Sequence, residues 1–325
     1  METGIFTDTY CICIPNLKRW VVVVQKDAGV RTLRRAVALC SVYGMSLYVL
    51  ELTMSLLFAY LGFRGSFYLY VTASVILSVC CILLPSVFLA YGTCGFKKCF
   101  GNNSEGIGKG NTVLLVCFGL GACMSLNFLV SMLSLFLPFF HTQGISYSGS
   151  DIGSTVLLIF GFAVVPAVCE EFAFRGTLFS LLSDYGSGCG VFISAAFFGM
   201  VHSGPSAMLF AFLSGIVFGF VRKCSGKILP SVIVHFCNNA IAVITSSMGS
   251  IFGEGVSGMV FIIVSAASFV LMIFAFVFLR YRGVGIFTLS RTQGVMSFRD
   301  KSAAVLKSVF LWLFILLAVV VKLLF

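Results

Sequence analysis

Residues 152–176 have the sequence IGSTVLLIFGFAVVPAVCEEFAFRG, and this stretch decides the class of fold. Its first part, 152–168, carries no charge and is mostly apolar, and about 20 such residues suffice for a helix to cross a bilayer. Glu170, Glu171 and Arg175 follow directly behind it. Because a charged side chain costs about 2.5–3.5 kcal/mol at the centre of a membrane helix, their presence indicates function.

The whole chain shares the apolar character of this stretch. It has 325 residues, of which 59% are hydrophobic and 10% charged, whereas soluble domains are about 45–50% apolar and about 25% charged. The apolar runs are continuous rather than alternating, which favours helices over barrel strands. We therefore predict an all-α polytopic membrane protein, a bundle of about eight to nine transmembrane helices. The predicted spans are 36–63, 66–91, 112–140, 153–182, 189–204, 206–221, 228–248, 256–279 and 303–325.

The net charge of +10 comes from basic clusters in the gaps between these spans. This is the positive-inside pattern of membrane proteins, so we expect a lipid bilayer as partner and no nucleic acid. The pattern places the N-terminus and the gaps that follow 91, 182, 221 and 279 in the cytoplasm. We expect an integral, multi-pass protein, located in the plasma (cytoplasmic) membrane if the source is bacterial.

Polar side chains on three different spans lie at a similar predicted depth. At a rise of 1.5 Å per residue, Glu170 lies about 18 Å from the inner end of its span, His202 about 20 Å and His235 about 11 Å. Pro166 removes one backbone hydrogen bond four residues before Glu170, which predicts a kink there. We therefore expect the three side chains to meet in a hollow that opens to the cytoplasm.

Helical spacing separates the acids into two groups. Glu171 and Arg175 are four residues apart, with the acid first, and this order favours an intrahelical ion pair. Glu170 is then rotated by about 100° away from that pair. A carboxylate without a cationic partner is suited to act as a general base.

The same four-residue spacing places two further pairs of side chains on shared helix faces. His235 and Asn239 are four residues apart, so one helix face presents an imidazole and a carboxamide that can both donate hydrogen bonds to an oxyanion. Phe198 and His202 share another face, where the phenyl ring would restrict rotation of the imidazole.

Other polar groups have no assigned chemistry. We expect Glu51 to pair with Arg175 or to remain protonated, Asn127 to join two helices, and His141 to be solvated in an outer loop. Two cysteine pairs could share a metal, although their spacings fit zinc modules poorly and reduced thiols are the expectation. These pairs are Cys11 with Cys13 and Cys94 with Cys99.

Three short motifs point to a known family. EEFAFRG (170–176), FGMVH (198–202) and HFCNN (235–239) resemble the ordered motifs EExxxR, FxxxH and HxxxN of the CAAX prenyl protease and abortive-infection family. The resemblance covers roughly residues 153–248. Members are glutamic-type intramembrane endopeptidases, so the resemblance implies peptide hydrolysis near the cytoplasmic side of the membrane.

The family pattern also implies roles for individual residues. Glu170, assisted by His202, would activate a water, and His235 with Asn239 would form the oxyanion hole. The pair of Glu171 with Arg175, together with Phe198, would support this constellation. No cofactor is implied. The substrate would be a membrane-associated protein or peptide, lipidated in the case of CAAX-type processing, whereas some bacterial relatives are linked to bacteriocin immunity.

The chain then divides into four parts. These are a cytoplasmic N-terminal segment, 1–35; N-terminal transmembrane helices, 36–152; the catalytic core, 153–248; and C-terminal transmembrane helices, 249–325.

Three other functions compete with a metal-independent protease. Glu170, His202 and His235 could instead be three zinc ligands of a metalloprotease, with a fourth position open for water. A proton-coupled transporter also uses buried carboxyls and imidazoles, although the sequence shows no related halves. The last alternative is a catalytically silent membrane scaffold or immunity protein.

Overall fold

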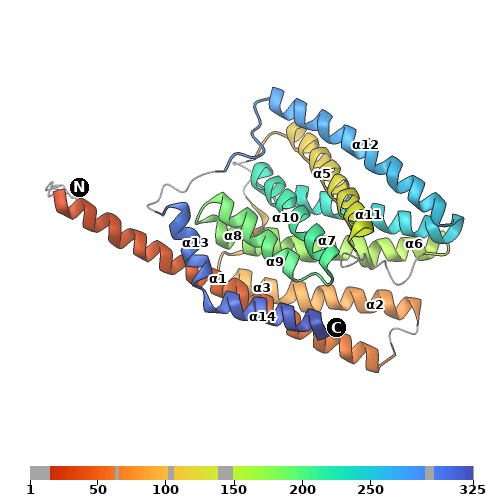
Figure 1. The fold of residues 1–325 in the computed structure, drawn as a ribbon, viewed down its shortest axis with the longest axis horizontal. Helices are drawn as coiled ribbons and strands as arrows, with labels where there is room; N and C mark the ends of the chain where they lie inside the picture. Colours follow the sequence, from red (N-terminus) through yellow and green to blue (C-terminus); the bar gives the residue numbers. More distant parts are fainter. Residues whose placement is uncertain (1–14, 63–65, 102–105, 138–148, 290–295, 325) are drawn as a thin grey trace, which may run out of the picture.

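The computed structural model describes residues 15–62, 66–101, 106–137, 149–289 and 296–324. Apart from an isolated bridge between Gly101 and Lys227, these residues form helices and their connections, as the composition predicts. The α-helices are α1 (Pro15–Tyr60), α2 (Phe67–Leu77), α3 (Leu84–Gly92), α4 (Phe96–Phe100), α5 (Lys109–Phe136), α6 (Ile152–Ile159), α7 (Val165–Glu171), α8 (Phe179–Ser183), α9 (Ser194–Met200), α10 (Pro205–Ser225), α11 (Leu229–Phe252), α12 (Glu254–Tyr281), α13 (Phe298–Leu306) and α14 (Val309–Leu324). Figure 1 shows their arrangement.

The structure confirms an all-α protein with several membrane-spanning helices. Within the described ranges, seven helices are long and apolar enough to cross a membrane, and the bent pair α13–α14 would be an eighth. The predicted span 189–204 is an exception. There the helix runs only from Cys189 to Met200, about 18 Å at the usual rise, and is too short to cross a hydrocarbon core of about 30 Å. The first helix also begins earlier than predicted, because α1 is continuous from Pro15.

The span that carries the opening motif, Ile152–Ser183, changes its winding along its length. Phe160–Val164 is π-helical immediately before α7, and Phe172–Leu178 is π-helical immediately after it. Pro166 lies in the first turn of α7, where its missing N–H costs least. The short α7 between two wide turns ends in Glu170 and Glu171, so the change of winding sets the direction of both acids.

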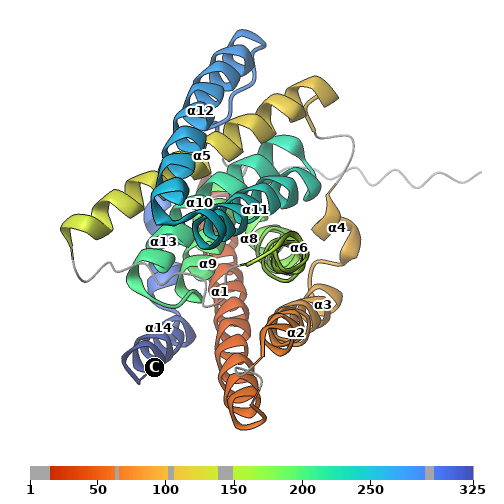
Figure 2. The same ribbon diagram turned by 90° about the vertical axis from the view of Figure 1, so that its right-hand side faces the viewer.

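The N- and C-terminal helices pack against the segment that carries the predicted motifs. Figures 1 and 2 show α14 lying beside α1, and the rings of Phe197 and Phe314 are stacked with centroids 5.0 Å apart. A Cβ atom at Gly44 would lie 2.7 Å from the Phe314 ring, so only glycine permits this approach. α1, α9 and α14 therefore share one core.

The Gly215 and Gly219 pair brings two helices of the core together. A Cβ atom at Gly215 would lie 3.2 Å from the Cα atom of Ala195, and one at Gly219 would lie 3.2 Å from the Cα atom of Val191. Such close approach of two helices is typical of the GxxxG spacing that these glycines have. It also holds the short α9 against the longer α10.

Loops at one end of the bundle are joined by polar contacts. Lys98 forms an ion pair of 2.6 Å with Asp184, and the Arg222 guanidinium donates to the Lys98 carbonyl at 3.1 Å. Arg282 donates to Asn111 at 3.1 Å. The loops that the charge pattern assigns to the cytoplasmic side therefore contact one another. Arg222, although basic, is buried, and its guanidinium binds the Lys98 carbonyl instead of facing solvent.

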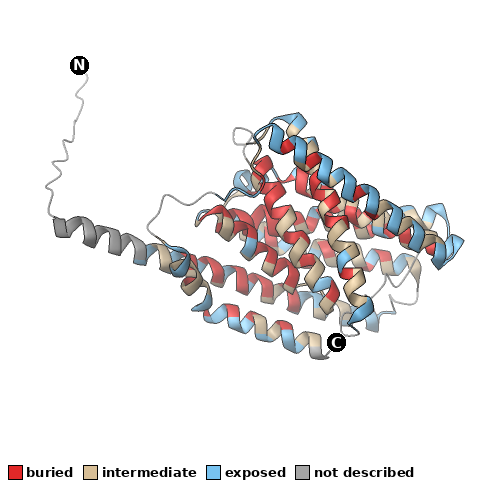
Figure 3. Cartoon of the chain, turned by 45° about the horizontal axis from the view of Figure 1, so that its top comes forward, coloured by how far each residue is buried: buried red, intermediate tan, exposed pale blue. Residues whose placement is uncertain are grey.

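Large apolar side chains cover much of the outer surface. Figure 3 shows long exposed faces on the outer helices. On α12, only 17% of an apolar stretch of 18 residues is buried inside the protein. Patches of this size are unusual on soluble monomers and fit contact with lipid. In contrast, Glu171, His235 and Asn238 on α7 and α11 are buried in the interior.

Candidate active site

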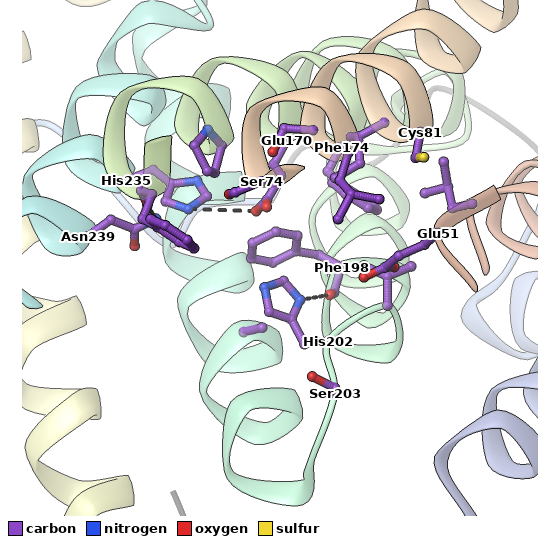
Figure 4. Close-up of a pocket in the computed structure, with 18 of the residues that line it drawn as sticks. Glu51, Ser74, Cys81, Glu170, Phe174, Phe198, His202, Ser203, His235 and Asn239 are labelled. Atoms are coloured by element: carbon purple, nitrogen blue, oxygen red, sulfur yellow. Dashed lines mark hydrogen bonds and ion pairs between the residues drawn. The ribbon is translucent and has the colours of Figure 1, made fainter. Parts of the chain in front are cut away.

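The structure brings the four predicted catalytic side chains to one cavity. Glu170, His202, His235 and Asn239 all line a space of about 550 Å³ (Figure 4). They come from α7, the turn after α9, and α11. The convergence expected from helix depth is therefore present, although it does not by itself establish a role for any of the four.

The Glu171–Arg175 ion pair predicted from spacing is present. Arg175 Nη1 lies 3.0 Å from Glu171 Oε1, and both side chains are fully buried. The Arg175 guanidinium also lies 4.2 Å from the ring centroid of Phe198 and 5.0 Å from that of Phe218. These cation–π contacts stabilise a guanidinium whose Nε and Nη2 have no hydrogen-bond partner. Arg175 is therefore paired with Glu171 and not with Glu51.

His235 lies between the two motif acids. Its Nδ1 is 3.0 Å from Glu171 Oε1, and its Nε2 is 3.7 Å from Glu170 Oε2. Phe218 stacks on the imidazole at a centroid distance of 4.9 Å and fixes its plane. A carboxylate only accepts, so Nδ1 carries the proton, and Nε2 can donate only when the ring is an imidazolium.

His202 is held by its own motif partner. Its Nδ1 donates to the Phe198 carbonyl at 2.7 Å, and the two rings meet edge to face at 4.7 Å. The two side chains thus lie on one face, as their spacing predicts, and the restriction of the imidazole by Phe198 stays a prediction. Because Nδ1 is the donor, the neutral ring keeps an acceptor lone pair on Nε2. His202 and Glu170 interact electrostatically, and both line the cavity.

Asn239 is oriented by two hydrogen bonds. Its Nδ2 donates to the Phe162 carbonyl at 3.3 Å, and its Oδ1 accepts from Asn238 Nδ2 at 3.2 Å. One N–H of the carboxamide remains for a ligand. The motif analysis missed Asn238, whose buried Oδ1 has no partner and which also lines the cavity. Its position three residues after His235, on the same helix face, was an available signal.

A second wall of the cavity comes from helices outside the motifs. α1 contributes Glu51 and Ser55, and α2 contributes Tyr70 and Ser74. In Figure 4, Glu51 lies across the cavity from His235. No sequence pattern predicts that α1 lies here, because a single acid in a long helix has no partner at helical spacing.

The remaining polar residues lie elsewhere. Asn127 lines a separate cavity of about 430 Å³ between α5, α11 and α12. Cys94 and Cys99 are close, with their sulfur atoms 3.3 Å apart, but outside the first cavity. His141, Cys11 and Cys13 lie outside the described residues. In the part of the chain that the structure describes, no three His, Cys, Asp or Glu side chains form a group that could hold a metal ion.

A comparison with protein families matches the segment that carries all three motifs. Residues 152–241 match the family model described as Rce1-like, type II CAAX prenyl endopeptidase. The segment is Rce1-like. This confirms the resemblance drawn from the motifs and indicates a peptide hydrolase in a membrane setting. The match includes Glu170, His202, His235 and Asn239 but neither α1 nor α2.

Comparisons with the curated proteins and with the solved structures found no match.

Proposed function

We propose that this chain is an intramembrane endopeptidase that hydrolyses a peptide bond in a membrane-associated protein or peptide, near the cytoplasmic side. One observation carries the proposal: Glu170 from α7, His202 from the turn after α9, and His235 with Asn239 from α11 line a single cavity within a largely apolar bundle. Each is costly to bury in a membrane protein, and their chemistry is complementary. The Rce1-like segment supports the reaction class.

In this proposal, Glu170 is the general base. Its carboxylate takes a proton from a water, and the remaining hydroxyl attacks the carbonyl carbon of the substrate. His202 accepts the second hydrogen of this water through Nε2, since its Nδ1 is held by Phe198. When the C–N bond breaks, Glu170 returns its proton to the leaving amine, so the carboxylate base is regenerated.

His235 and Asn239 stabilise the oxyanion of the tetrahedral intermediate. Asn239 has one N–H left for this purpose, and the imidazolium of His235 donates from Nε2. Glu171 holds the His235 ring from the other side, and Arg175 neutralises Glu171. The chain's own residues thus provide a base and two oxyanion donors, and we propose that no cofactor is needed.

The lining of the cavity indicates the kind of substrate. Most of the surface that lines the cavity is apolar, and it includes Leu47 and Phe58 on α1 and Leu77 on α2. Such a surface suits an extended peptide that carries an apolar group. Prenylated C-terminal peptides are therefore the first class to test, in keeping with the description of the matching family.

The proposal is tested by comparing the peptides that membranes release. Membranes containing the natural protein or Glu170→Gln are incubated, and soluble peptides are identified by mass spectrometry. Glu254→Gln, a carboxyl in the separate cavity, is the control. Peptides released by the natural protein and by Glu254→Gln, but lost with Glu170→Gln, support the proposal. Identical release from all three membranes would exclude it.

The zinc-dependent version predicts a different response to chelation. If Glu170 is the base, cleavage by the purified protein continues at its full rate in 1,10-phenanthroline, and metal analysis finds no stoichiometric zinc. If the same residues are zinc ligands, the chelator abolishes cleavage and added Zn²⁺ restores it.

A further inference from the structure

The Glu51 side chain belongs to the same cavity but has no role in the proposed reaction. It lies on α1, outside the Rce1-like segment. Leu47, Glu51, Ser55 and Phe58 recur at helical spacing and form the face of α1 that lines the cavity. Figure 4 shows Glu51 directed toward Phe198 and His202, opposite His235 and Asn239.

A contact next to Glu51 holds this part of α1 in place. The Tyr48 hydroxyl, three residues earlier, donates a hydrogen bond to the carbonyl of Met200, the last residue of α9. The Tyr48 ring also contacts Phe314 on α14 at a centroid distance of 5.8 Å. This part of α1 is therefore fixed beside the turn that carries His202, and the exposed Glu51 side chain extends from it.

The carboxyl of Glu51 lacks a cationic partner. None of the ion pairs between described side chains involves Glu51. Neither lysine nor arginine is among the described residues that line the cavity, whereas two glutamates are. Glu51 and Glu170 interact electrostatically across it. With His235 as an imidazolium 3.7 Å from Glu170, Glu51 is the acid among the described lining residues that has no cation beside it, and the low-dielectric walls strengthen its attraction for one.

A second polar group in the cavity lining, the side-chain oxygen of Asn238, lacks a hydrogen-bond donor. Asn238 Oδ1 is buried and has no hydrogen-bond partner, although the amide nitrogen of the same side chain is bonded to Asn239. An unpartnered buried acceptor is costly, so a ligand that donates an N–H here gains affinity. An ammonium or guanidinium group, with several N–H donors, is complementary to the carboxyl of Glu51, whereas a backbone N–H of the same bound peptide is complementary to the Asn238 acceptor.

We propose that Glu51 determines specificity by binding a lysine or arginine side chain of the substrate. This inference rests on the proposed function, because it assigns the substrate segment to the same cavity. The charged group would lie near Glu51, and the bond to be cleaved would lie between Glu170 and Asn239. A substrate with a carboxylate near Glu51 would be disfavoured by repulsion.

The test measures binding rather than cleavage. The full chain carrying Glu170→Gln is placed in nanodiscs of neutral phosphatidylcholine. The probes are acylated, C-terminally amidated peptides in which a lysine is moved through each position of a neutral sequence, with norleucine at the same position as the matched probe. We expect one lysine position to give about tenfold tighter binding than norleucine.

Two variants make the result specific to Glu51. Adding Glu51→Gln should abolish the lysine preference while leaving norleucine binding unchanged, and adding Glu254→Gln should leave both unchanged. Equal or absent binding of the lysine and norleucine peptides, or a preference that survives Glu51→Gln, would overturn the inference. Failure of the natural protein to cleave any peptide, with the preference intact, would contradict only the proposed function.

Discussion

At the scale of single residues, the spacing within a motif determines which side chains pair along one helix. Which side chains reach the cavity also depends on how the helices pack against one another. Glu171 and Arg175 pair within one helix, so the sequence alone predicts this contact. Asn238 shares the His235 face of α11, so the local spacing contained a signal for it that the motifs do not include. Glu51 reaches the cavity through the packing of α1 against other helices, and no local pattern encodes that packing.

The buried pair of Glu171 with Arg175 gives a stability prediction. Arg175→Met removes the cation and leaves Glu171 charged and enclosed, so the free energy of unfolding should fall by about 3–5 kcal/mol. Replacing both residues, as Glu171→Met with Arg175→Met, should restore most of the loss. Equilibrium unfolding in detergent measures both. Equal destabilisation by the single and double changes would show that the pair is not the cause.

The paired thiols of Cys94 and Cys99 lead to a pH prediction. A hydrogen bond from the Cys99 thiol lowers the pKa of the Cys94 thiol to about 6, against the opposing effect of burial. The group therefore loses its proton as pH rises through about 6, and alkylation of Cys94 should reach half its maximal rate there instead of near 8.5.

Variants of Cys99 test whether the hydrogen bond from its thiol causes the lowered pKa of Cys94. Cys99→Ala removes the donor and should move the midpoint of Cys94 alkylation upward, whereas Cys99→Ser keeps a donor and should move it less. Iodoacetamide labelling across pH, followed by mass spectrometry of the peptide, measures the midpoint. A midpoint near 8.5 in the unaltered protein would contradict the assigned hydrogen bond.

At the scale of helices, hydropathy predicts most spans and fails at one. The apolar residues of 189–204 suggest a crossing, but the helix ends at Met200 and Gly204 adopts a positive φ of 80° before α10 begins. Hydropathy cannot distinguish a short buried helix from a crossing, because both are apolar. The short helix is what places His202 at the cavity rather than at a membrane surface.

The contact between α1 and α14 gives a packing prediction. Gly44→Ala would place a methyl group 2.7 Å from the Phe314 ring, so the free energy of unfolding should fall by about 1–3 kcal/mol. Phe314→Leu added to it should recover part of this loss. Gly258→Ala is the matched control, since nothing lies within 4 Å of a Cβ there. A similar loss at both glycines would indicate a general intolerance of alanine.

At the scale of the whole molecule, the sequence predicts sidedness and the structure shows which loops meet. The Arg282–Asn111 contact joins the end of α12 to the start of α5, and Lys98–Asp184 joins two further loops at that end. Basic residues predict that this end is cytoplasmic. The arrangement of α1, α2 and α14 around the Rce1-like segment has no signal in the sequence, because lipid-facing and protein-facing apolar residues look alike.

Epitope tags test this arrangement. Tags inserted in 102–105 and in 290–295 should be accessible from the same side, the cytoplasm. A tag in 138–148, at the far end of α5, should be accessible from the opposite side, because α5 is long enough to cross the membrane. Antibody binding before and after permeabilisation measures the side of the membrane on which each tag lies. Accessibility of all three tags from one side would refute the topology.

The most direct test concerns the Glu170 carboxyl. Purified protein in liposomes is given a membrane-anchored prenylated peptide, and the new C-terminus is quantified by mass spectrometry. Glu170→Gln should lower the cleavage rate by about 10²–10⁴-fold while its thermal unfolding stays unchanged. A Glu170→Gln protein that cleaves the peptide at the natural rate would contradict the account.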